Sequence, residues 1–192
     1  MLLLFQCVAL GVSISVSAAD AQATPSQVTE LSGRAADPFA AQNGVKPPVT
    51  VLLFLRSDCP ISNRYAPEIQ RIASVYSRQG ARFWLVYPDA SDPGVNVARN
   101  VQEYGYKLPV LRDPAHELVK LGEVEVMPEA AVFMNGRLVY HGRIDDRVAA
   151  FGISRAQPTT HDLEDALRAA LHGHPPAEAA APGVGCYISD IK

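Results

Sequence analysis

A single cysteine stands where a buried strand gives way to a helix, and this arrangement constrains the fold more than any other part of the chain. Residues 51–76 read VLLFLRSDCPISNRYAPEIQRIASVY. An apolar run ends at a polar turn, Cys59 and Pro60 follow, and apolar positions then recur at spacings of three and four. The first pattern is typical of a strand covered on both faces, and the second of a helix with one buried face. We therefore expect a central strand that delivers a thiol to the start of a helix.

Strand-like and helix-like segments alternate along the rest of the chain. Asn135 and Gly136 separate two apolar runs, which is a strong hairpin signal. Further strands are expected at 81–87 and within 108–114, and further helices at 95–104, 116–121 and 161–172. Pro67 should kink the first helix. This order predicts a three-layer α/β domain with a mixed central sheet and helices on both faces.

The two ends of the chain differ from this central region. Residues 1–19 are apolar and uncharged and end in small residues, which predicts a signal peptide, with an uncleaved membrane anchor as the alternative. Residues 20–48 are expected to form an arm and loops, 49–173 the domain, and 174–192 a flexible tail rich in Pro and Ala. The expected location is periplasmic or extracellular, at the membrane only if the first segment is retained.

Charge and cysteine content limit the classes of function. The formal net charge is -3, and Lys and Arg are scattered, which argues against a nucleic-acid surface and favours small-molecule or protein partners. Of the three cysteines, Cys7 lies in the expected signal peptide, so that Cys59 and Cys186 remain in the mature chain. In an oxidising compartment these two could pair, share a metal ion or act separately.

The setting of Cys59 favours a reactive thiol. If it caps the helix that starts at Pro60, its sulfur faces free N–H groups and the positive end of the helix dipole, which lower the pKa of a cysteine. Arg56 and Arg64 would strengthen this effect, and Asp58 would oppose it. The alternative is an inert, buried cysteine.

The segment around Cys59 resembles the active site of the thioredoxin superfamily. In that superfamily a Cys-x-x-Cys motif opens the first long helix, and a proline kinks the helix eight residues after the first cysteine, as Pro67 follows Cys59 here. Pro128 in VMPEAAVF matches the superfamily's cis-proline, which lies opposite the active site. More narrowly, DCPISNRYAPE, LPVLRDP, YHGRIDDR and GCYI resemble secreted redoxin-domain proteins of the AhpC/TSA and TlpA-like kind.

This resemblance spans Val49 to Leu171 and implies a thioredoxin-like α/β/α fold. It also implies an antioxidant or thiol–disulfide oxidoreductase activity that requires no cofactor. The implied partners are protein thiols or disulfides, a peroxide or a small thiol. Cys59 would be the nucleophile, Pro128 would shape the groove, and the active-site loop would include Asp58, Pro60, Ser62 and Arg64.

The chain also departs from the related families. Ser62 takes the place of the second, resolving cysteine, and a hydroxyl cannot resolve a mixed disulfide. Where peroxiredoxins carry a threonine or serine and a proline ahead of the cysteine, this chain has Arg56 and Leu52. Where copper proteins of the Sco type have a second cysteine, it has Asn63.

Cys186 is the candidate to resolve Cys59. The twelve residues 174–185 would reach roughly 20 Å as a loose coil.

An alternative is a Cu(I) site built from both cysteines with Met127 and either His141 or His161. A third reading is an interaction module without catalysis. The charged residues 145–147 are expected to form an exposed turn with local ion pairs, and the alternative is that they line the thiol groove or bind a proton.

Overall fold

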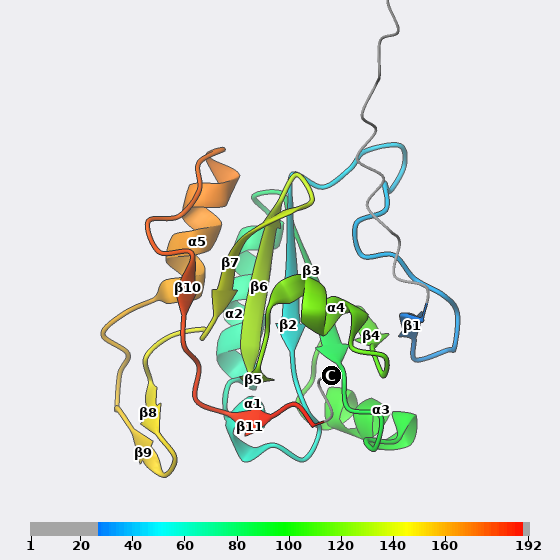
Figure 1. The fold of residues 1–192 in the computed structure, drawn as a ribbon, viewed down its shortest axis with the longest axis vertical. Helices are drawn as coiled ribbons and strands as arrows, with labels where there is room; N and C mark the ends of the chain where they lie inside the picture. Colours follow the sequence, from blue (N-terminus) through cyan, green and yellow to red (C-terminus); the bar gives the residue numbers. More distant parts are fainter. Residues whose placement is uncertain (1–26, 190–192) are drawn as a thin grey trace, which may run out of the picture.

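A seven-stranded mixed sheet forms the centre of the molecule (Figure 1). The computed structural model describes residues 27–189, so the expected signal peptide lies outside the described residues. The strand order is β1-β4-β3-β2-β6-β7-β10. The bounds of these strands are β1 Thr29–Glu30, β2 Val49–Phe54, β3 Ala81–Tyr87, β4 Val110–Arg112, β6 Glu129–Met134, β7 Arg137–Gly142 and β10 Ala180–Ala181. Strands β2, β3 and β4 are parallel, whereas β6 is antiparallel to β2 and β7, which confirms a mixed sheet.

Four further short strands lie outside this sheet. β5 (Val126–Met127) pairs with β11 (Cys186–Tyr187), and β8 (Val148–Ala150) pairs with β9 (Ile153–Ser154). The helices are α1 Pro60–Arg64, α2 Ala66–Ser77, α3 Gly94–Glu103, α4 Glu117–Gly122 and α5 Asp162–Leu171. None of the helices within the described residues has the length and apolar character needed to cross a membrane.

The side chains of β2 alternate between two hydrophobic clusters, one on each face of the sheet. Val51 and Leu53 belong to the cluster that α2, α3 and α5 cover. Leu52 and Phe54 belong to the second cluster, which α4 covers. The alternation follows from the two-residue period of a strand and explains why the whole of β2 is apolar. The expected three layers are therefore present (Figure 1).

The helix expected after Cys59 is divided into two. α1 ends at Arg64, α2 begins at Ala66, and Tyr65 lies between them with φ of -79° and ψ of -7°. Pro67 falls in the first turn of α2, where its missing N–H leaves no helical hydrogen bond unmade. The predicted irregularity at Pro67 is confirmed as a break rather than a kink within one helix.

The turn at 145–147 is buried, so the prediction that it is exposed is wrong, whereas the expected local ion pair is present between Arg147 and Asp145 at 3.4 Å. Asp145 and Asp146 are only 2% and 7% exposed. The Tyr65 hydroxyl donates to Asp145 at 2.5 Å, and the backbone N–H groups of Thr159 and Thr160 donate to Asp146. These donors replace water around the carboxylates, so the turn ties the junction of α1 and α2 to the approach to α5.

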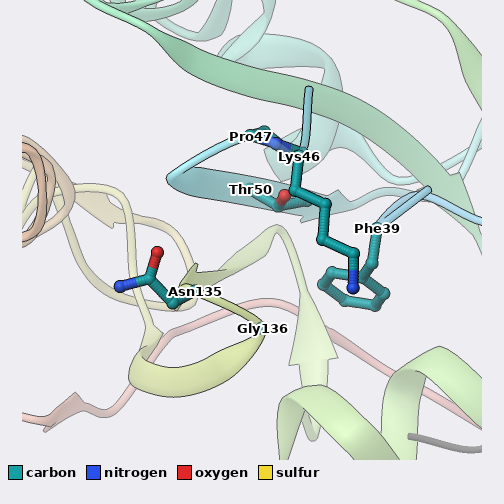
Figure 2. Close-up of a pocket in the computed structure, with 6 residues that line it drawn as sticks. All are labelled: Phe39, Lys46, Pro47, Thr50, Asn135 and Gly136. Carbon is teal, nitrogen blue, oxygen red and sulfur yellow. The ribbon is translucent and has the colours of Figure 1, made fainter. Parts of the chain in front are cut away.

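The expected hairpin is present at the end of the sheet that lies away from Cys59. Asn135 and Gly136 have φ of 50° and 80° and connect β6 to β7. Beside this turn lies a small pocket of about 130 Å³. Figure 2 shows its lining, which consists of Phe39, Lys46, Pro47, Thr50, Asn135 and Gly136. Because Cys59 follows the opposite end of β2, this pocket does not belong to the thiol site.

The short helix α4 begins at a buried carboxylate. Asp113 is fully buried and accepts the backbone N–H groups of Glu117, Leu118 and Val119 at 2.8, 2.9 and 3.0 Å. These bonds satisfy N–H groups that the first turn of a helix leaves without partners. Burial outweighs these hydrogen bonds and raises the pKa of Asp113 to about 6.

This raised pKa predicts how the stability of an Asp113→Asn variant compares with that of the wild type. A carboxyl whose folded pKa exceeds its unfolded value contributes stability at low pH and loses that contribution as the pH rises through the folded value. The difference in unfolding free energy, wild type minus variant, should therefore decrease between about pH 4 and about pH 7. Urea denaturation of both proteins across this range measures it. A difference that grows with pH would contradict the assignment.

Candidate active site

Cys59 and Cys186 form a disulfide, although 127 positions separate them in the sequence. Their Cα atoms are 6.3 Å apart. Cys59 follows β2 and is the residue that precedes α1, and its carbonyl accepts the N–H of Asn63 at 3.0 Å. Cys186 lies in β11 at the far end of the chain. Of the arrangements that the sequence left open, the structure therefore has the two cysteines paired.

The C-terminal segment, for which we expect a flexible tail, is docked on the domain as far as Ser189. Figure 1 shows it in red, passing β7 as β10 and then reaching α1 as β11. The Arg143 N–H donates to the Ala181 carbonyl at 2.9 Å. Gly142 makes this approach possible, because a Cβ there would lie 1.9 Å from the Ala181 carbonyl oxygen.

Glu129 ties the tail to the strand beneath it. This carboxylate is 5% exposed and accepts the backbone N–H groups of Gly183 at 3.0 Å and Glu125 at 3.1 Å. Burial raises its pKa, and these N–H groups oppose the rise. One buried side chain therefore positions both the tail and the segment leading into β5.

Pro128 lies beside the disulfide. The Met127–Pro128 peptide bond is cis, as the resemblance implies. The Met127 carbonyl oxygen lies 3.4 Å from the Cys59 Sγ, and Met127 pairs with Cys186 across the two short strands. The Met127 side chain is fully buried in the hydrophobic cluster that contains Phe54. The contact with the Cys59 sulfur is thus made by the backbone carbonyl of Met127.

A polar network holds the loop that carries Cys59. Ser57 donates its N–H and its hydroxyl to Asp92 at 3.1 and 2.7 Å. The Ser57 carbonyl accepts from the side-chain amides of Asn63 and Asn100, both at 3.0 Å. Asn100 in turn accepts the Tyr87 hydroxyl at 2.8 Å. We did not identify these residues from the sequence, because isolated polar residues in separate elements carry no shared pattern.

The other residues of the expected active-site loop have separate roles. Ser62 is 1% exposed, and its hydroxyl has no hydrogen-bond partner within the described residues. Arg56 forms ion pairs with Asp58 at 2.6 Å and with Asp89 at 3.0 Å. That Arg56 lowers the pKa of the Cys59 thiol stays a prediction.

Pro60 and Arg64 lie at the two ends of α1. Pro60 is its first residue, in agreement with the preference of proline for the first helical turn. Arg64 is its last residue and donates to the Ser154 hydroxyl at 2.7 Å. This contact links α1 to the β8–β9 hairpin.

The histidines considered as metal ligands lie beside carboxylates. The Nε2 atom of His141 is 3.7 Å from Glu123, and the Nδ1 atom of His161 is 3.7 Å from Glu164. Between residues 27 and 189, no group of three or more His, Cys, Asp and Glu side chains is arranged to hold a metal ion. The Cu(I) hypothesis stays untested by this geometry.

Comparisons with known proteins support the fold. Neither the scan against protein-family models nor the search of curated proteins found a match. An uncharacterized conserved protein from Geobacillus kaustophilus has a similar structure, with 26% identity and a TM-score of 0.67 over 84% of this chain and 86% of that chain. A putative thioredoxin from Neisseria meningitidis is 18% identical, with a TM-score of 0.55 over 74% of this chain and 85% of that one.

A secreted Mycobacterium tuberculosis disulfide oxidoreductase homologous to E. coli DsbE is also similar. It shares 16% identity, with a TM-score of 0.51 over 76% of this chain and 93% of that one. These similarities show a thioredoxin-like fold. The protein is thus a thioredoxin-fold protein with one cysteine before α1 and its disulfide partner in the C-terminal strand.

Proposed function

We propose that this protein is an exported thiol–disulfide oxidoreductase in which Cys59 is the nucleophile and Cys186 resolves it. The observation that carries the proposal is the disulfide between these two residues, located before α1 and beside Pro128. Ser62 cannot supply the second sulfur, and Cys186 supplies it from the other end of the chain. Protein thiols and disulfides are the proposed substrates.

The reaction is an exchange in two steps. In the reduced protein, the Cys59 thiolate attacks a substrate disulfide, and one substrate thiolate leaves. The Cys186 thiolate then attacks the Cys59 sulfur, the second substrate thiolate leaves, and the Cys59–Cys186 disulfide forms. The substrate gains two electrons and the protein loses two. The same steps in reverse oxidise a substrate dithiol.

The proposal of export rests on the signal-like residues 1–19 and on the cysteine pair. Disulfides persist in the oxidising compartments outside the cytoplasm. One similar protein of solved structure is described as a secreted disulfide oxidoreductase. Mass spectrometry of the protein purified from its native cell checks this proposal, because a mature chain that begins near Asp20 is expected.

Single-turnover kinetics test the activity. The reduced protein is mixed with an aromatic disulfide whose thiolate is coloured, and we expect two thiolates released per protein together with a Cys59–Cys186 disulfide. Hydrogen peroxide serves as the second oxidant, because a peroxidase would form the same disulfide through a sulfenic acid. We expect the disulfide to react faster. Faster reaction with peroxide would favour a thiol peroxidase instead.

Copper carriage is the second candidate. It is favoured by the same observation, since two adjacent sulfurs form a soft site suited to Cu(I) once the disulfide is reduced. Titration of the reduced protein with Cu(I) distinguishes the two functions. Stoichiometric binding that is lost in Cys59→Ser, together with an absence of disulfide turnover, would support the carrier.

A further inference from the structure

The short strand β5 has a single sheet partner among the described residues, and that partner is the tail. Cys186 pairs with Met127, Tyr187 pairs with Val126, and the Ile188 N–H donates to the Glu125 carbonyl at 3.2 Å. The tail thus lies antiparallel to β5 with its cysteine directly over Cys59. Departure of the tail would leave the backbone groups of β5 open to another extended segment.

The side chains of the tail alternate as in a docked strand. Cys186 faces the disulfide site, Tyr187 is 74% exposed, and Ile188 is 6% exposed. Ile188 belongs to the hydrophobic cluster that contains Leu118 and Val124. An apolar site therefore lies two residues beyond the cysteine, and the position between them makes little demand on its side chain.

The residue before the cysteine is restricted to glycine. A Cβ on Gly185 would lie 2.2 Å from the Met127 carbonyl oxygen and 2.6 Å from the Met127 carbonyl carbon. Both are backbone atoms, so a side-chain rotation cannot relieve the overlap. A segment docked in this register needs a glycine, or a local shift away from β5, at that position.

A substrate must use the space that the tail fills. Cys59 is only 1% exposed while β11 lies over it, so a substrate disulfide can reach the Cys59 thiol of the reduced protein only after β11 has moved away. Reduction removes the one covalent bond that holds β11 in place. The vacated groove consists of the edge of β5, the space above Cys59 and the apolar site of Ile188.

We propose that the tail occupies the substrate-binding groove in the same way as a substrate segment does. Preferred substrates then carry an extended segment with glycine directly before the reactive cysteine and an aliphatic residue two positions after it. This inference rests on the proposed exchange activity and adds its sequence preference. The partner is therefore an unfolded or exposed extended segment rather than a small thiol.

The test uses reduced, full-length Cys186→Ser protein and peptide disulfides. The parent peptide has the sequence of residues 183–189, GVGCYIS. Its cysteine is joined to a coloured aromatic thiol, which leaves as the thiolate when Cys59 attacks the peptide sulfur, so that a Cys59–peptide disulfide forms. Two variant peptides replace the isoleucine by aspartate or the glycine directly before the cysteine by valine. A third, the matched control, replaces the tyrosine by aspartate.

The rate constant for reaction with Cys59 should be at least about tenfold lower for the isoleucine and glycine replacements than for the parent peptide. The isoleucine replacement loses an apolar contact, and the valine in place of glycine overlaps with the backbone of β5. The tyrosine replacement should change it by less than about twofold. Equal rate constants for all four peptides would overturn the inference and leave the exchange activity standing. No reaction of Cys59 with any peptide or with the free aromatic disulfide would instead overturn the proposed function.

A second pair of variants asks whether the tail competes for the same groove. In the Cys186→Ser background, Ile188→Asp should weaken the docking of the tail and raise the rate constant for the parent peptide several-fold. Tyr187→Asp is the control and should leave that rate constant unchanged. An unchanged rate constant in Ile188→Asp would show that the tail does not occupy the substrate groove.

Discussion

Replacement of Cys59 by serine should lower the rate of disulfide exchange by about a thousandfold or more, because the hydroxyl cannot act as the attacking sulfur. Cys186→Ser should behave differently. It should complete the attack on the substrate and then stop with the substrate bound to Cys59, because no thiolate is present to release it. Mass spectrometry without reductant should detect this adduct in Cys186→Ser and not in Cys59→Ser.

Tyr187→Ser is the matched control for these variants. Tyr187 is adjacent to Cys186 in the same short strand but is largely exposed, so the variant should complete the full cycle. An adduct that fails to accumulate in Cys186→Ser, with turnover retained, would mean that another group resolves Cys59. Ser62 would not be that group.

Reduction of the disulfide should lower the free energy of unfolding by about 3–5 kcal/mol. The bond joins positions 127 apart, and a long loop closed by a covalent bond restricts the unfolded chain strongly. Urea denaturation of the oxidised and reduced wild type measures the difference. Cys186→Ser should match the reduced wild type in both redox conditions, and a loss below about 1 kcal/mol in the wild type would contradict a structural contribution of this bond.

Limited proteolysis of the same samples should distinguish local release of the tail from destabilisation of the whole domain. If reduction mainly frees the tail, cleavage should begin after α5, whereas the sheet should stay resistant. The segment between Gly173 and Cys186 is mostly exposed. It is held by the pairing of β10 with β7, by the bond from Gly183 to Glu129, by the packing of Ala181 and Val184 on the core, and by the disulfide that follows it. Early cleavage within β2 or β3 would instead indicate that the disulfide stabilises the whole domain.

The main features of the fold could be predicted from the sequence because they rest on long, regular patterns. The apolar run of β2 and the Asn135–Gly136 turn each have a local physical cause. The burial of Asp145 had no such local sign, because its main partner is Tyr65, distant in the sequence. Charged triplets are usually exposed, and only the packed structure shows the donors that make this one an exception.

The candidate site likewise contains some residues that local motifs predict and others that only the packed structure reveals. Cys59 and Pro128 could be assigned from local motifs, and both lie at the disulfide. The docking of the tail could not be foreseen, because β10 and β11 are only two residues long and show no periodic pattern. Their positions depend on backbone pairing, on the buried Glu129 and on glycines that allow close approach.

The most direct test of the account is peptide mapping without reductant after equilibration in glutathione buffers of graded potential. We predict that Cys59 and Cys186 appear as one linked peptide pair in oxidising buffers and convert together to two free thiols in reducing buffers, as a single two-electron couple. Two cysteines that stay free in oxidising buffer, or that take up glutathione independently of each other, would contradict the assignment of a reversible redox pair.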